Sequence, residues 1–137
     1  LPYELTGVDI DKDQINNARI NNPEIQFVVC DGKNTSFNNN QFDLTLVLEV
    51  LEHEKYFKEL IQEAKRVSYK YCIFSVPNEP LWRILNILRG AHLINWGNTP
   101  GHINHWTRDN FVNLLKEYFE IIDVYSPIPW TVVKCKK

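Results

Sequence analysis

The stretch FDLTLVLEVLEH, from Phe42 to His53, decides which fold the sequence predicts. Its first part, FDLTLVLE, is apolar almost throughout, and a continuous apolar run of this length is typical of a parallel strand covered on both faces. Directly behind it, Glu49, Glu52 and His53 place two carboxylates and an imidazole where a core would otherwise continue. Charged side chains are almost never fully buried unless they are paired. The stretch therefore indicates a buried sheet and a polar site at the end of one of its strands.

The segments around this stretch alternate between strand-like and helix-like patterns. They predict further strands at YELTGVD, EIQFVVCD, YCIFSVP, FEIIDVY and WTVVKC, and helices that begin after Asp11, near Lys55, at Leu81 and after Thr107. The last two strands are joined by SPIP, which is too short for a parallel crossover, so we expect them to pair antiparallel. Strands and helices in alternation, closed by an antiparallel pair, are typical of a three-layer α/β fold.

The composition is that of an ordinary globular protein. The chain has 137 residues, 44% hydrophobic and 23% charged, which predicts a single domain over residues 1–137. The net charge of -2 provides no basic field that would attract RNA or an anionic membrane. The three cysteines are odd in number and widely spaced, which fits neither a zinc knuckle nor a disulfide framework. We therefore expect a cytoplasmic protein that acts on a small molecule; the oligomeric state stays open.

Polar residues stand at the ends of the predicted strands. Asp9, Asp31 and Glu49 each lie at the carboxyl end of a strand, and the residues after Ser75 lie at the end of another. In α/β sheets, ligands bind outside the carboxyl ends of the parallel strands. This edge of the sheet is therefore the predicted site.

Two of these strand ends suit a nucleotide. Asp9 stands where an acidic residue can accept hydrogen bonds from ribose hydroxyls, and Ile10 offers an apolar surface for a base. Asp31 can accept from an exocyclic amine, while the backbone N–H of Gly32 can donate to a ring nitrogen. The alternative is structural, because Asp starts many turns and Asp-Gly is itself a strong turn signal. The pattern by itself leaves both interpretations open.

Longer segments carry a family resemblance. In chain order they are TGVDIDKDQINNAR, IQFVVCDG, FDLTLVLEVLEH, ELIQEAKRV, CIFSVPNE and GHINHWTRDNF. This ordered set resembles the class I S-adenosylmethionine-dependent methyltransferases, above all the type 11 group that includes ubiquinone-biosynthesis O-methyltransferases. The resemblance implies a Rossmann-like, mostly parallel sheet with helices on both faces. It also implies S-adenosyl-L-methionine as cofactor, and methyl transfer to an oxygen, nitrogen or carbon atom of a small molecule.

The same resemblance assigns roles to individual residues. Asp9 would bind the ribose, and Asp31 the adenine amine, with Ile10 and Gly32 beside them. Leu48 and Glu49 would lie beside the methionine part of the cofactor.

One family feature is missing from the sequence. Members of the family begin with a strand, a loop of the type G-x-G-x-G and a helix, whereas no two of the five glycines here form G-x-G. We therefore expect an N-terminally truncated domain that lacks the first strand and helix, so that the other strands leave a gap or repack. The alternative is a non-catalytic methyltransferase-like fragment or partner domain. A nicotinamide-dependent oxidoreductase would also use Asp9, but it leaves the closing hairpin and EVLEH without a role.

The segment EVLEH predicts a second kind of chemistry. Glu49, Glu52 and His53 would share one face if the segment is helical, and they could bind a divalent cation such as Mg²⁺ or Zn²⁺. His102 is the expected further ligand, with His105 as the other choice. Some ubiquinone-pathway O-methyltransferases and small-RNA 3′-end methyltransferases resemble this pattern and use it for a metal. Two alternatives remain open: Glu52 and His53 act as catalytic groups without metal, His53 as a general base, or Glu52 only caps the next helix.

Overall fold

The computed structural model describes residues 3–90, 96 and 98–137. In chain order, the elements are β1 (Thr6–Asp9), α1 (Lys12–Asn21), β2 (Gln26–Val29), β3 (Phe42–Leu48), the 3-10 helix η1 (Leu51–His53), α2 (Phe57–Val67), β4 (Ser68–Pro77), α3 (Leu81–Leu88), α4 (Arg108–Lys116), β5 (Glu120–Tyr125) and β6 (Trp130–Lys136). The predicted alternation of strands and helices is confirmed. Within the described ranges, no helix has the length and apolar character needed to cross a membrane.

Capping side chains explain where two of the helices begin. Asp11 precedes α1, and its carboxylate accepts hydrogen bonds from the backbone N–H groups of Asp13 and Gln14. Thr107 precedes α4, and its hydroxyl accepts from the N–H of Asn110. Both starts were predicted from the sequence, because a cap involves only residues two or three positions away.

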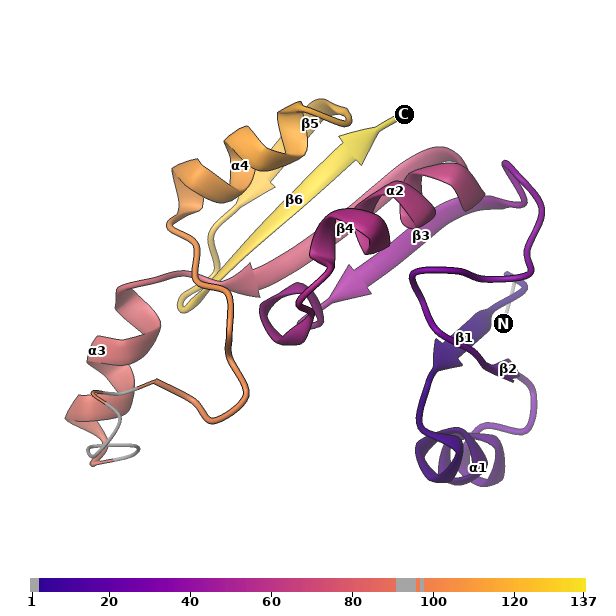
Figure 1. The fold of residues 1–137 in the computed structure, drawn as a ribbon, viewed down its shortest axis with the longest axis horizontal. Helices are drawn as coiled ribbons and strands as arrows, with labels where there is room; N and C mark the ends of the chain where they lie inside the picture. Colours follow the sequence, from indigo (N-terminus) through magenta and orange to yellow (C-terminus); the bar gives the residue numbers. More distant parts are fainter. Residues whose placement is uncertain (1–2, 91–95, 97) are drawn as a thin grey trace.

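The strands form two sheets (Figure 1). β1 pairs with β2 in parallel, and β3 pairs with β4 in parallel. β6 runs antiparallel to both β4 and β5, so the larger sheet has the order β3-β4-β6-β5. The predicted α/β fold, with parallel pairs and a closing antiparallel pair, is confirmed.

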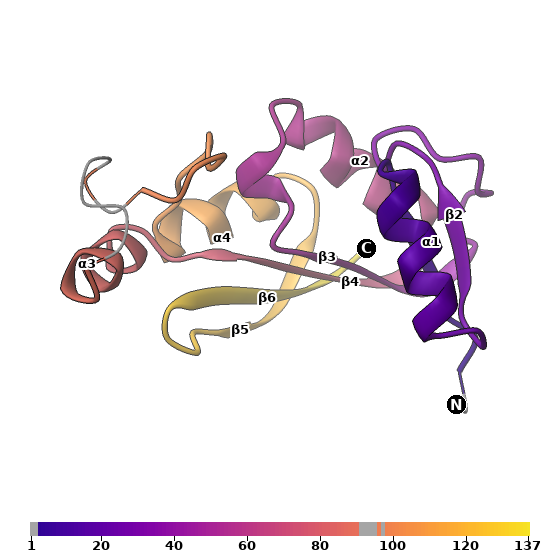
Figure 2. The same cartoon turned by 90° about the horizontal axis from the view of Figure 1, so that it is seen from below.

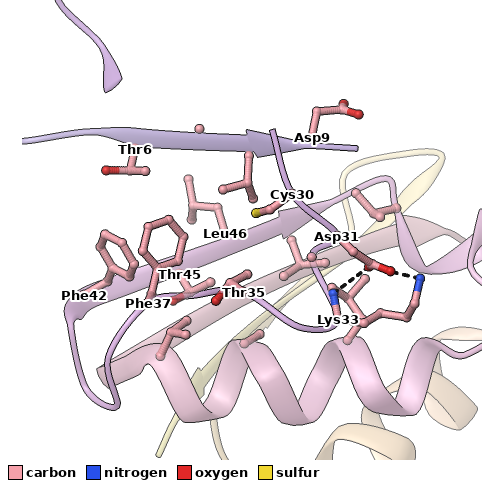
Figure 3. A pocket seen from close by; sticks show the side chains of 18 of the residues that line it. Thr6, Asp9, Cys30, Asp31, Lys33, Thr35, Phe37, Phe42, Thr45 and Leu46 are labelled. Carbon is pink, nitrogen blue, oxygen red and sulfur yellow. Dashed lines mark hydrogen bonds and ion pairs between the residues drawn. The ribbon is translucent and has the colours of Figure 1, made fainter. Parts of the chain in front are cut away.

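β1 and β3 do not pair, and a cavity of about 620 Å³ lies between them. All of β1 and all of β3 except Asp43 contribute to its lining. Figure 3 shows Thr6 and Asp9 on one strand and Phe42, Thr45 and Leu46 on the strand across the cavity. Of the two outcomes expected for these strands, a gap or a repacked sheet, the structure has the gap.

The larger sheet is covered by α2 and α4 on one face (Figure 2). Val47 of β3 points to this face and is 7% exposed, whereas Leu44, Leu46 and Leu48, which alternate with it, are 45–55% exposed. The expectation that this strand is covered on both faces therefore does not hold within the described residues, since α2 is the helix that packs on β3 there. α1 packs on the smaller sheet instead.

Candidate active site at the carboxyl edge

The cavity between β1 and β3 collects most of the residues predicted to bind a cofactor. Its lining includes Asp9, Ile10, Asp31, Gly32 and Leu48. Glu49 is not part of the lining, but it follows Leu48 directly and so lies at the rim. The strand ends therefore meet at one edge, as the sequence predicted.

Both aspartates are held by the backbone that follows them. Oδ1 of Asp9 accepts from the N–H of Asp11 at 2.8 Å, and Oδ1 of Asp31 accepts from the N–H of Lys33 at 2.9 Å. The Lys33 ammonium lies 3.1 Å from Asp31 and 2.8 Å from Glu54 (Figure 3 shows Asp31 and Lys33). Hydrogen bonds from the Lys33 N–H and then from its ammonium lower the pKa of Asp31. Asp31 is therefore ionised at neutral pH and can accept hydrogen bonds from a ligand.

Glu49 has an unusual backbone conformation and two side-chain partners. Its φ is 55°, in the left-handed region that residues other than glycine rarely adopt. Its Oε1 accepts from the hydroxyl of Ser75 at 2.6 Å, and its Oε2 accepts from the indole N–H of Trp130 at 2.6 Å. Because η1 begins only at Leu51, Glu49 does not share a helix face with the residues that follow. This differs from the expected metal-binding set, in which Glu49 was the first ligand.

The other three predicted metal ligands lie together. One ligand atom each of Glu52, His53 and His102 can be chosen so that all three lie within 4.8 Å of one another. The rings of His53 and His102 meet edge to face at 4.7 Å, and Trp82 stacks on His102 at 6.1 Å. His105, the other histidine considered, lies 3.5 Å from Glu79 instead. A carboxylate and two imidazoles in this arrangement could hold a cation or move a proton.

Glu52 is the most unusual member of this cluster. It is 1% exposed, and among the described residues neither carboxylate oxygen has a hydrogen-bond partner. Burial, together with the nearby negative charge of Glu49, raises the pKa of Glu52 to about 7. A perturbed carboxyl group of this kind is typical of functional sites.

Gly101 and Asn104, to which the sequence analysis assigned no role, position His53 and η1. The carbonyl of Gly101 lies 3.0 Å from Nδ1 of His53, which leaves Nε2 for a ligand if Nδ1 carries the proton. Gly101 has a φ of +92°, and a Cβ there would lie 3.3 Å from that same Nδ1. The side-chain amide of Asn104 donates to the carbonyls of Leu51 and Glu54 and so ties the loop to both ends of η1. The sequence signal for Gly101 was only the Pro-Gly turn that it ends.

The aromatic residues divide between core and site. Trp106 packs against the core and contacts the rings of Phe57 and Phe111. Trp130 was not singled out from the sequence, yet it reaches Glu49 and also contacts Trp82 at 5.8 Å between ring centroids. No local pattern could have found it, because it lies 81 positions from Glu49 along the chain.

Comparisons with known proteins agree with this arrangement. A family model described as a methyltransferase domain matches residues 1–73. The comparison with curated proteins found no significant match. Among solved structures, a SAM-dependent methyltransferase from Methanosarcina mazei is 20% identical, with a TM-score of 0.77 over 98% of this chain and 82% of that one.

Two further solved structures have the same fold. The PH0226 protein of Pyrococcus horikoshii is 17% identical, with a TM-score of 0.76 over 98% of this chain and 74% of that one. Magnesium protoporphyrin IX methyltransferase of Synechocystis, solved with bound SAH, is 15% identical, with a TM-score of 0.73 over 98% of this chain and 64% of that one. The family model covers more than half of the chain. The chain therefore belongs to the methyltransferase-domain family, and it is a class I S-adenosylmethionine-dependent methyltransferase.

Proposed function

We propose that this methyltransferase acts on a small hydroxylated molecule and transfers the methyl group to an oxygen atom, with nitrogen or carbon as the other acceptors. The observation that supports this most is the reach of the cavity. Its lining extends from Asp9 and Asp31, the candidates for nucleotide binding, to Val50 and Glu54. Val50 and Glu54 flank η1, which carries Glu52 and His53. A cofactor site and an acceptor site are therefore adjacent at one edge of the sheet.

The carboxyl end of the cavity suits the cofactor in its chemistry, whereas the rest of the cavity runs along β1 and β3. We assign the ribose hydroxyls to Asp9 and the adenine amine to Asp31, with Ile10 and Leu48 as apolar walls and the N–H of Gly32 as donor. Each aspartate has roughly four lone-pair positions, of which the described residues use only those on Oδ1. The cofactor supplies an electrophilic methyl group on a sulfonium, so the main tasks of the protein are to position the reactants and to exclude water.

On the acceptor side, we assign a divalent cation to Glu52, His53 and His102. Imidazole and carboxylate donors suit Zn²⁺, and Mg²⁺ is the alternative. The lack of partners on the Glu52 oxygens supports this assignment, because a buried carboxyl group without partners is costly. A cation there would hold the hydroxyl of the acceptor and lower its pKa. Without a cation, His53 would take the proton as a general base.

We further propose that residues 1–137 belong to a single methyltransferase domain whose sheet is completed by one more strand. The open edges of β1 and β3, with the cavity between them, support this proposal. A strand inserted there would pair on both sides, because neighbouring strands lie about 4.8 Å apart and both edges need hydrogen-bond partners.

Calorimetric titration with S-adenosylhomocysteine tests the cofactor site. It is carried out on this chain and on a version extended at its N-terminus by an apolar strand, a G-x-G-x-G turn and a helix. We expect saturable binding, tighter in the extended version, that falls at least about tenfold in Asp9→Asn and in Asp31→Asn, since each loses a charged hydrogen-bond acceptor. Asp43→Asn is the matched control, because Asp43 is exposed and does not line the cavity. No binding in either version would contradict the proposed function and favour the non-catalytic alternative.

Titration with Zn²⁺ and with Mg²⁺ tests the cation. We expect Glu52→Gln to weaken binding strongly, since it removes the only anionic donor of the cluster. Glu79→Gln is the control, because Glu79 is also buried and also lies beside a histidine, but outside the cluster. Equal affinity in wild type and Glu52→Gln would remove the cation from the proposal and leave His53 as the base.

A further inference from the structure

Glu49 is held in its left-handed conformation by contacts from two distant strands. A non-glycine residue in this region is strained, so it persists only where its surroundings determine it. The N–H of Glu49 donates to the carbonyl of Ser75 at 3.2 Å, and the Ser75 hydroxyl donates to Oε1 at 2.6 Å. The indole of Trp130 donates to Oε2 at 2.6 Å. Ser75 lies in β4 and Trp130 starts β6, so one carboxylate oxygen is fixed from β4 and the other from the closing hairpin.

These donors orient the carboxylate without neutralising it. Ser75 and Trp130 are both uncharged, so neither brings a positive charge to the carboxylate. Each of its oxygens uses one donor, which leaves roughly half of its lone-pair positions open. Glu49 is also exposed at the rim of the cavity, next to Leu48 in the lining. The Glu49 carboxylate can therefore bind a cation that carries N–H donors.

The indole is itself held in place by aromatic contacts. Trp130 lies 5.8 Å from Trp82, and Trp82 stacks on His102 of the acceptor cluster. A ring held on this side cannot easily turn its N–H away from Glu49. The rings of Trp130, Trp82 and His102 therefore form a row. This row runs from Glu49, at the rim of the cavity, to the cluster of Glu52, His53 and His102.

We infer that Trp130 is a positioning residue: its indole N–H fixes the Glu49 carboxylate so that it accepts a hydrogen bond from the α-ammonium of the cofactor's methionine part. The inference rests on the proposed cofactor site. It goes further by assigning a role in cofactor selection to the closing hairpin.

Two nucleosides distinguish this role from simple packing. S-adenosylhomocysteine carries the α-ammonium, and 5′-methylthioadenosine lacks it, while both carry the adenine and the ribose. Trp130→Phe keeps an aromatic ring but removes the N–H. We expect this variant to bind S-adenosylhomocysteine about tenfold more weakly and 5′-methylthioadenosine as well as wild type does, as for the loss of one hydrogen bond to a charged group. Trp96→Phe is the matched control, because Trp96 is 79% exposed.

The possible outcomes separate this inference from the proposed function. Equal losses for both nucleosides in Trp130→Phe, or no loss for either, would overturn the role of Trp130 while leaving the cofactor site intact. If wild type binds neither nucleoside, even in the extended version, the proposed function fails and the inference fails with it.

A second measurement needs no nucleoside. In a ¹H–¹⁵N spectrum, the indole N–H signal of Trp130 is identified by its disappearance in Trp130→Phe. We expect Glu49→Gln to move this signal more than those of the other three tryptophans, because an ionised acceptor is replaced by a neutral one. An unmoved signal would show that the Trp130–Glu49 hydrogen bond does not form, and would overturn the inference independently.

Discussion

Two glutamates with little exposure, Glu63 in α2 and Glu52 in η1, are treated in opposite ways by this fold. Glu63 is 9% exposed, and its oxygens accept from the N–H and hydroxyl of Thr35 and from the guanidinium of Arg66. The Arg66 hydrogen bonds, followed by those from Thr35, lower the pKa of Glu63 to about 2. Glu52 is 1% exposed, has no such partner among the described residues, and has its pKa raised to about 7 by burial.

The difference separates a structural carboxylate, Glu63, from Glu52, for which we propose a function. Glu63 ties the segment around Thr35 to α2. This segment follows Asp31 and Gly32, which we propose bind the nucleotide. The free-energy cost of burying Glu63 is offset within the fold, because both of its carboxylate oxygens accept hydrogen bonds. Among the described residues, Glu52 has no such compensation next to His53 and His102, and a buried carboxyl group in this environment is typical of functional sites. Burial alone would not have told the two apart; the partners do.

The largest expected effect is the pH dependence of stability that Glu52 causes. The pKa of Glu52 is about 7 in the folded chain against 4.5 for an ordinary glutamate, so its contribution to stability is fully present below pH 4.5 and is lost as the pH rises through 7. Wild type should therefore lose about 3 kcal/mol of unfolding free energy, relative to Glu52→Gln, between pH 4.5 and pH 8. Urea unfolding of both proteins across this range measures it. Parallel stability curves would contradict the raised pKa.

For Glu63, the pH dependence of the contribution to stability has the opposite sign. The pKa of Glu63 is lowered to about 2, so its contribution is present above pH 4.5 and is lost as the pH falls through 2. Glu63→Gln should destabilise the chain by about 2 kcal/mol at pH 7, somewhat less than the full shift implies, because Arg66 is one-third exposed. Glu59→Gln in the same helix is the control, since Glu59 is exposed and should change stability by less than about 0.5 kcal/mol. A loss at pH 7 no larger than that of the control would show that the Arg66 and Thr35 contacts do not stabilise the fold.

The smallest expected effect concerns the way in which Gly101 positions the ring of His53. Gly101→Ala and Gly90→Ala both place a side chain at positive φ, which should cost about 1 kcal/mol each in thermal unfolding. A Cβ at Gly101 lies 3.3 Å from Nδ1 of His53, whereas one at Gly90 meets nothing within 4 Å. Only Gly101→Ala should therefore move the imidazole ring signals of His53 in an NMR spectrum. A shift of equal size in Gly90→Ala would show that the loop does not position this ring.

Much of the fold was predictable because its signals are local. The caps at Asp11 and Thr107, the apolar run of β3 and the short SPIP connection each involve residues close together in the chain. The ends of the strands, and with them Asp9 and Asp31, followed from the same periodicity. The exposed side of β3 did not, because a strand's pattern does not reveal which helices are present to cover it.

The site was predictable in composition but not in geometry. Glu49, Glu52 and His53 were expected to act together, on the assumption that EVLEH is one regular helix. The left-handed turn at Glu49 separates it from the other two and directs it to Ser75 and Trp130. The partners of His53 and η1 come from Gly101 and Asn104, about 50 positions further along the chain.

The sequence by itself determined the order of strands and helices, the family, and which acidic groups stand at the strand ends, because periodicity, capping and strand-end chemistry act over a few residues. Only the tertiary structure decided which of those groups are paired. Glu63 meets Thr35, and Glu49 meets Ser75 and Trp130, across 26 to 81 positions of chain, while Glu52 meets no such partner among the described residues. The charge state of a buried carboxyl group depends on these long-range partners and on desolvation, and neither is encoded in its immediate neighbours.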